Sequence, residues 1–250
     1  MENEFMLRTP QTTTFPIPNS DDASWEVKFY KADFNRGNEP MFLMPGIQTA
    51  EHDVEDLVDY FCQTRDVYVS SLYATSFQVA PEPEYHKERV ERFFTAAEEL
   101  RLGPVALCAL DESGATACMI AEQKPGLVDN LFLLDPILST SSYVADAASI
   151  LEKRIGSYED LRTGYHPEDK TAYKVLNLLS QDSALGDKNL QSIKAHTRIY
   201  GHEGSSVDPS LLRAMANLIP NCVLSVVDAN EAEFVDQVIK LWSDLASDNL

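Results

Sequence analysis

Short apolar segments alternate along the chain with segments whose apolar residues recur at helical spacing. A continuous apolar run predicts a strand buried on both faces, and a 3.6-residue period predicts a helix with one buried face. The predicted strands are residues 25–34, 41–44, 66–70, the first half of 104–118, 127–134, 197–201 and 223–227. The predicted helices are residues 54–61, 85–100, the second half of 104–118, 209–219 and 231–246. Strands that alternate with helices indicate an α/β protein with a mostly parallel sheet covered on both faces.

Two regions depart from this alternation. Residues 1–23 are polar and contain three prolines, which predicts an irregular N-terminal arm. Residues 139–194 show helical patterns at 143–155 and 170–179 but no strand pattern, so we expect a small helical cap inserted into the sheet domain. The predicted organisation is an arm at 1–24, a core formed by 25–138 and 196–250, and a cap at 139–195.

Residues 104–118 are the stretch around which the chain is organised. An apolar run follows Gly103 and Pro104 and gives way at once to small residues, which predicts a buried strand that turns sharply into a helix. We call residues 109–113 the elbow. Such a turn raises one side chain above the edge of the sheet, and here that side chain is Asp111. Because it stands at the start of the predicted helix, this carboxylate has a structural alternative as a helix cap.

Composition and charge narrow the classes of partner. The chain has 40 acidic and 20 basic residues, a net charge of -20, which disfavours nucleic acids and anionic membranes as partners. The four cysteines are scattered without metal-ligand spacing, and no glycine-rich nucleotide motif occurs. No N-terminal signal or membrane-length apolar run is present. We therefore expect a cytoplasmic protein that uses neither a metal nor a dinucleotide cofactor.

The order of these cues over residues 25–246 resembles the α/β-hydrolase family. The text MFLMPGI is similar to the family's strand and oxyanion loop, and VALCALDESGATACMIAEQKPGLVDNLFLLDP resembles its nucleophile elbow, helix and following strand. HTRIYG resembles the strand before the acid loop, and LLRAMANLIPNCVLSVVDANEAEF resembles the last helix, strand and histidine loop. The resemblance implies the α/β-hydrolase fold.

The resemblance assigns Asp111 to the nucleophile position, with the helix-ending proline at Pro125 fixing the register. Ser113 is the alternative, which would move the elbow by two residues and shorten the helix. Pro45 and Gly46 stand where the family has its oxyanion loop, so the resemblance implies that the backbone N–H groups of Ile47 and Glu112 form an oxyanion hole.

The remaining triad positions depart from the family pattern. Asn230 stands near the position of the family's histidine and cannot move a proton near neutral pH. Gly204 occupies the expected acid position, with Glu203 or Asp208 as displaced substitutes. His202, at the carboxyl end of a predicted central strand, is the candidate base. His86, in a charged helix, is expected to be solvated.

Three functions remain open. The first is a protein without the usual triad that binds a small apolar molecule, either as a pseudoenzyme or as a cyclase, lyase or isomerase. The second is a hydrolase with Asp111 as nucleophile and His202 as base. The third is a non-catalytic partner subunit, and the oligomeric state is left open. Predicted ligand contacts are Gly46, Tyr73, Ser113 and Asn230.

Overall fold

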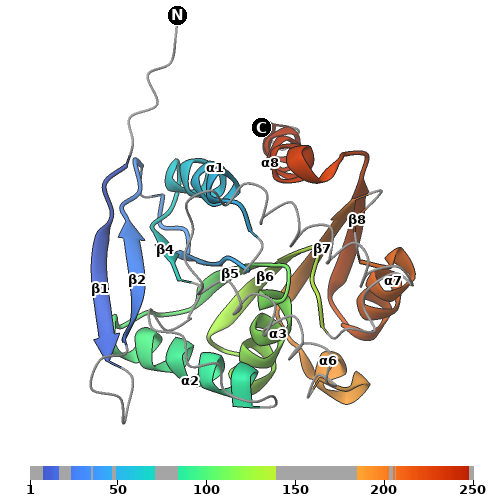
Figure 1. The fold of residues 1–250 in the computed structure, drawn as a ribbon, viewed down its shortest axis with the longest axis horizontal. Coiled ribbons are helices and arrows are strands. Elements are labelled where there is room, and N and C mark those ends of the chain that lie inside the picture. Colours follow the sequence, from blue (N-terminus) through green and yellow to red (C-terminus); the bar gives the residue numbers. More distant parts are fainter. Residues whose placement is uncertain are drawn as a thin grey trace, which may run out of the picture.

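The computed structural model describes residues 8–16, 24–34, 36–46, 49–70, 84–138, 185–202, 205 and 207–247. Eight strands form one sheet in the order β1-β2-β4-β3-β5-β6-β7-β8 (Figure 1). The strands are β1 (Gln11–Pro16), β2 (Ser24–Tyr30), β3 (Met41–Met44), β4 (Val67–Val69), β5 (Val105–Leu110), β6 (Val128–Leu134), β7 (His196–His202) and β8 (Cys222–Val227). The pairs formed by β1 with β2 and by β2 with β4 are antiparallel, and the other five are parallel.

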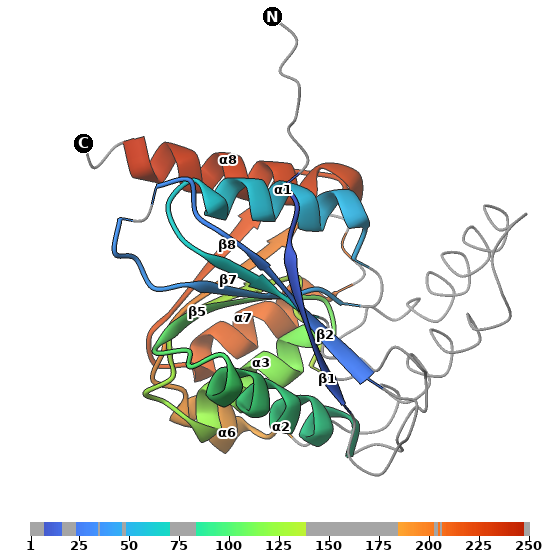
Figure 2. The ribbon, with the colours of Figure 1, turned by 90° about the vertical axis from the view of Figure 1, so that its left-hand side faces the viewer.

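Helices cover both faces of the sheet. Figure 2 shows α1 (Glu51–Cys62) and α8 (Phe234–Ser247) together on one face, with α8 preceded by the short helix η3 (Glu231–Glu233). The other face carries α2 (Glu84–Glu99), α3 (Ser113–Gln123), α6 (Asp187–Ser192) and α7 (Pro209–Leu218). The predicted mostly parallel α/β sheet is therefore confirmed. None of the described helices is long and apolar enough to span a bilayer.

The strict alternation of side chains along the strands divides the core into two layers. In β3, Met41 and Leu43 join the cluster beneath α1 and α8, whereas Phe42 and Met44 join the cluster on the opposite face. All six residues of β5 are buried and contribute alternately to the two clusters. A strand with apolar side chains on both faces is stable only between two helical layers, which explains its continuous apolar run.

The N-terminal arm contains a strand that the sequence pattern missed. The expectation of an irregular lead-in was wrong for Gln11–Pro16, which pairs antiparallel with β2. Four of its six side chains are exposed threonines or glutamine, so no apolar pattern marks the strand. Phe15 anchors it by stacking on Trp25 with ring centroids 4.3 Å apart. The division into arm, core and cap stays a prediction, and the helical patterns at 143–155 and 170–179 lie outside the described residues.

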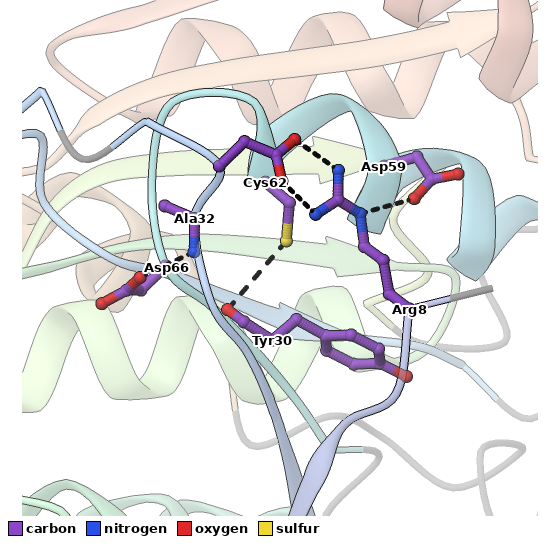
Figure 3. A network of polar contacts seen from close by, with 7 residues as sticks. Arg8, Tyr30, Ala32, Asp59, Cys62 and Asp66 are labelled. Atoms are coloured by element: carbon purple, nitrogen blue, oxygen red, sulfur yellow. Dashed lines mark hydrogen bonds and ion pairs between the residues drawn. The ribbon is translucent and has the colours of Figure 1, made fainter. Parts of the chain in front are cut away.

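Arg8, just before β1, ties this end of the chain to the domain (Figure 3). Its guanidinium donates to both oxygens of Asp33 at 2.7 and 2.6 Å, and its Nε donates to Asp59 at 2.9 Å. The hydrogen bond from Arg8 lowers the pKa of the Asp33 carboxyl. Nearby, burial raises the pKa of the Cys62 thiol to about 11, so this cysteine is a thiol at neutral pH. All four cysteines are free.

Gly114 lets helix α3 approach the loop that follows β6. A Cβ atom at this position would lie 2.6 Å from the Cβ of Pro136 and 3.1 Å from its Cα. Because the proline ring and backbone cannot yield easily, any larger residue would force the helix away from the sheet. Gly126, by contrast, is exposed and has open space where its Cβ would stand.

We predict that Gly114→Ala lowers the free energy of unfolding by about 1–3 kcal/mol, the usual cost of overpacking a core. The matched variant Gly126→Ala should be neutral or slightly stabilising, since it removes backbone entropy from the unfolded chain without a clash. Urea denaturation of the two variants and the parent measures both effects. Equal stabilities for the two variants would contradict the close approach.

Candidate functional site

Three polar residues lie along the carboxyl edge of the sheet. Asp111 follows β5 directly, Asp135 follows β6, and His202 is the last residue of β7. These three strands are parallel neighbours, so their carboxyl ends lie side by side. Neighbouring strands are about 4.8 Å apart, which places Asp111 and His202 one intervening strand from each other. This is the edge at which open α/β sheets bind their ligands.

Asp111 occupies the sharp turn between strand and helix. Its φ is 53°, the left-handed region that aspartate tolerates better than most residues. Its N–H donates to the carbonyl of Leu134 at 3.1 Å, and its carbonyl accepts from Gly114 and Ile137 at 3.0 and 2.9 Å. These bonds hold the turn against the end of β6. Glu112, not Asp111, is the residue immediately before helix α3.

The loop after β3 packs on this turn through Gly46. A Cβ there would lie 2.6 Å from Oε2 of Glu112 and 2.8 Å from the Cβ of Asp111, so only glycine fits. The Thr49 hydroxyl accepts from the N–H of Gly46 at 2.8 Å and donates to Oδ2 of Asp111 at 3.0 Å. The Gly46 donor is therefore already used inside the loop. Ile47, one of the two predicted oxyanion donors, lies outside the described residues.

Ser113 faces the protein interior. It is fully buried, donates to the carbonyl of Pro45 at 2.8 Å, and accepts from Nη2 of Arg89 at 2.7 Å. A hydroxyl has a single hydrogen to donate, and here that hydrogen holds the loop after β3. In this arrangement Ser113 supports the elbow from below, and Asp111 is the residue at its turn.

His202 and Asp135 form a buried pair. Nδ1 of His202 lies 2.5 Å from Oδ2 of Asp135, and their side chains are only 4% and 9% exposed. The ring of Phe234, from the start of α8, packs on the imidazole with centroids 4.7 Å apart. Both ring nitrogens of His202 are buried, and among the described residues neither makes a hydrogen bond of ordinary geometry, so the contact of Nδ1 with Asp135 is a close approach of two polar groups. A carboxylate this close favours the proton on Nδ1, in which case Nε2 carries the lone pair.

His202 was predicted from the sequence as the candidate base, whereas Asp135, which the structure places beside it, was not singled out. Its signal was present in the sequence, because an aspartate directly after a buried strand and before Pro136 stands at the carboxyl edge. Glu203 and Asp208, the residues expected to replace the family's acid, are not the carboxylates that contact His202 among the described residues. Asp208 caps helix α7 instead, where its carboxylate accepts from the N–H of Ser210 at 2.8 Å, a bond that lowers the pKa of Asp208. Glu203 lies outside the described residues.

The other predicted contacts are dispersed or not described. Asn230 is exposed in the loop after β8, and its carbonyl accepts from the N–H of Glu233 at 3.1 Å. Tyr73 lies outside the described residues. Among the residues that are described, no three histidine, cysteine, aspartate or glutamate side chains form a group that could hold a metal ion.

A buried polar layer lies behind the elbow, between α2 and α3. The expectation that His86 is solvated was wrong, because its side chain faces α3 and is 2% exposed. Its Nδ1 lies 2.9 Å from the Thr116 hydroxyl. Burial, helped by the positive charge of Arg89, lowers the pKa of His86 from 6.5 to about 3. His86 is therefore neutral in the folded protein.

This pKa difference predicts how stability depends on pH. Between about pH 3 and 6.5 the unfolded chain binds a proton at His86 that the folded chain does not. His86 therefore causes stability to fall as the pH is lowered through this window, by up to about 1.4 kcal/mol per pH unit. We expect His86→Gln, which keeps a polar partner for Thr116, to make this dependence shallower. Urea denaturation across the window would measure it, and an unchanged slope would contradict the buried neutral histidine.

Comparisons with known proteins are informative at the level of structure. No protein-family model matches the chain, and no curated protein matches it by sequence. One similar solved structure is 2-hydroxy-6-oxo-6-phenylhexa-2,4-dienoate hydrolase from Rhodococcus sp. strain RHA1, with 10% identity, a TM-score of 0.71, and coverage of 94% of this chain and 99% of that one. Another is naproxen esterase from Bacillus subtilis, with 10% identity, a TM-score of 0.66, and coverage of 94% and 92%.

A third similar structure is an α/β hydrolase enzyme from a Medee basin deep-sea metagenome library. It shares 12% identity and a TM-score of 0.68, with coverage of 93% of this chain and 95% of that one. Together these similarities show that the chain has the α/β-hydrolase fold. At identities this low they show the fold alone, so the chemistry must be argued from the residues of the site.

Proposed function

We propose that this protein of the α/β-hydrolase fold binds a small, largely apolar molecule and moves a proton within it, without hydrolysing it. The observation that carries the proposal is the buried Asp135–His202 pair at the carboxyl edge of the sheet. A buried imidazole nitrogen without a hydrogen-bond partner has an energetic cost, because it has lost its bond to water. A ligand that supplies a proton or an acceptor at Nε2 removes that cost.

The roles of the residues follow from their contacts. Asp135 fixes the orientation of the His202 ring and stabilises the imidazolium that forms when Nε2 accepts a proton. Phe234 packs on the ring and keeps water from it. Asp111, held by Thr49, accepts a hydrogen bond from a hydroxyl or amine group of the ligand. A base opposite a polar anchor suits cyclisation, elimination or isomerisation, in which one proton leaves and another returns.

Two observations argue against hydrolysis by an ordinary triad. The chain has no histidine after His202, and Asn230 stands exposed in the loop where the family's histidine is expected. The buried side chain of Glu112 lies against the loop after β3, and an ionised carboxylate there would oppose the negative charge of an oxyanion.

We predict that His202→Gln lowers proton transfer by about 10²- to 10⁴-fold, the usual contribution of a positioned base. Asp135→Asn should cost about 10- to 100-fold, because it disturbs only the orientation and charge of the ring. The assay is incubation with pooled small carbonyl compounds in heavy water, with mass spectrometry to detect deuterium taken up at carbon.

The control variant is His196→Gln, which replaces an exposed histidine at the start of the same strand. Compounds that bind without deuterium uptake would contradict the proposal and indicate a pseudoenzyme.

A second candidate function is hydrolysis through an ester on Asp111. The position of Asp111 at a turn with φ 53° favours it, since this is where the fold raises a nucleophile. The carboxylate would displace halide from a haloalkane, or open an epoxide whose ring oxygen then takes a proton from water. Water activated by His202 would next attack the ester carbonyl, which releases the alcohol and regenerates the Asp111 carboxylate.

The two candidates predict different results in the His202→Gln variant. Hydrolysis through Asp111 requires that epoxide or haloalkane probes leave a stable ester on the Asp111 peptide, because the second step lacks its base. Proton transfer without a nucleophile predicts no adduct. Peptide mass spectrometry distinguishes them, with the double variant Asp111→Asn and His202→Gln as the control for labelling elsewhere.

A further inference from the structure

The outer strand β8 (Cys222–Val227) leaves an apolar edge uncovered. It is the last strand of the sheet, so among the described residues nothing pairs with its outer backbone groups. Val223 is 61% exposed and Val226 43%, and with Phe34 they are the exposed large hydrophobic residues of the described part of the chain. An edge with both open hydrogen-bonding groups and exposed valines is a template for another strand.

The opposite edge of the same sheet provides a comparison. Strand β1 exposes polar side chains, mainly threonines, and ends at Pro16, so it has features that limit pairing with a further strand. Strand β8 has the sequence CVLSVV, with no charge and no proline. In a chain of net charge -20, this uncharged, β-branched edge is the part of the sheet best suited to accept a strand.

We propose that β8 pairs antiparallel with β8 of a second copy of this chain, which joins the two sheets across a two-fold axis. Such an axis is perpendicular to the sheet, so directly opposite residues must point to the same face and differ by an even number of positions. With Ser225 on the axis, Val223 faces Val227 of the second copy and Leu224 faces its Val226. All four of these pairs across the axis are apolar, and the two Ser225 side chains meet at the centre.

The neighbouring register is less favourable. With Leu224 on the axis, Val223 faces Ser225 of the second copy, which pairs an apolar with a polar side chain. The apolar pairs are then Leu224 with Leu224 and Cys222 with Val226. The axis at Ser225 therefore buries more apolar surface. Two six-residue strands alone bury less than the roughly 1,200 Å² of a standard stable interface, so we expect a reversible dimer that depends on concentration.

The net charge of the chain predicts how dimerisation depends on salt. Two copies of charge -20 repel each other, and salt screens that repulsion. Dimerisation through β8 should therefore become tighter as salt is added. This interface uses neither Asp111 nor the Asp135–His202 pair, so its failure and the failure of the proposed function are distinguishable.

The test is sedimentation equilibrium over a range of protein and salt concentrations. The parent chain should approach twice its 27.9 kDa mass, more readily at high salt. The Val223→Lys, Val226→Lys double variant should stay monomeric, and the double variant Thr12→Lys, Thr14→Lys on exposed residues of β1 should dimerise like the parent. Both variants reduce the net negative charge equally, so repulsion cannot explain a difference between them.

Hydrogen exchange provides an independent readout that does not require a variant. Amides of β8 should become more protected as the protein concentration rises, whereas those of β1 should not. A parent chain that stays monomeric, or that forms open-ended assemblies, would overturn the proposal. So would a dimer that the β1 variant disrupts and the β8 variant does not.

Discussion

The loop after β3, the elbow with the start of α3, and the loop after β6 pack against one another through glycine residues. The geometry of the site depends on this close backbone contact. Gly46 lies against the Cβ of Asp111, Gly114 lies against Pro136, and the N–H of Asp111 bonds to the end of β6. Because the backbones approach so closely, the ends of β3, β5 and β6 are fixed relative to one another. Rigid strand ends can hold polar side chains in a set geometry, which a mobile loop cannot do without loss of precision.

The buried polar pair comes from the ends of two neighbouring strands. The start of α8 contributes Phe234 as a packing surface, while the imidazole comes from the end of β7 and the carboxylate from the residue after β6. Both aspartates of the edge, Asp111 and Asp135, have positive φ, at 53° and 43°. A backbone in the left-handed region is uncommon for residues other than glycine and is often retained where it positions a functional group.

The sequence predicted the core strands because their environment is uniform. The all-apolar segments that became β3 and β5 are buried on both faces, so pattern and structure agree. Strand β1 was missed because pairing with β2 and one aromatic contact hold a segment of exposed threonines. His86 was misjudged because its partner, Thr116, is 30 residues away and no local pattern reveals it. Asp135 was not singled out although its place after a buried strand was visible, because its contact with His202 depends on the pairing of β6 with β7.

The central claim is that Asp135 holds His202 with Nδ1 protonated and Nε2 available to a ligand. The most direct measurement is the nitrogen NMR spectrum of the His202 ring in the neutral form, in the parent chain and in Asp135→Asn. We expect a protonated Nδ1 in the parent and a shift of the tautomer balance when the carboxylate is replaced. A proton on Nε2 in the parent, or a spectrum that Asp135→Asn leaves unchanged, would contradict it.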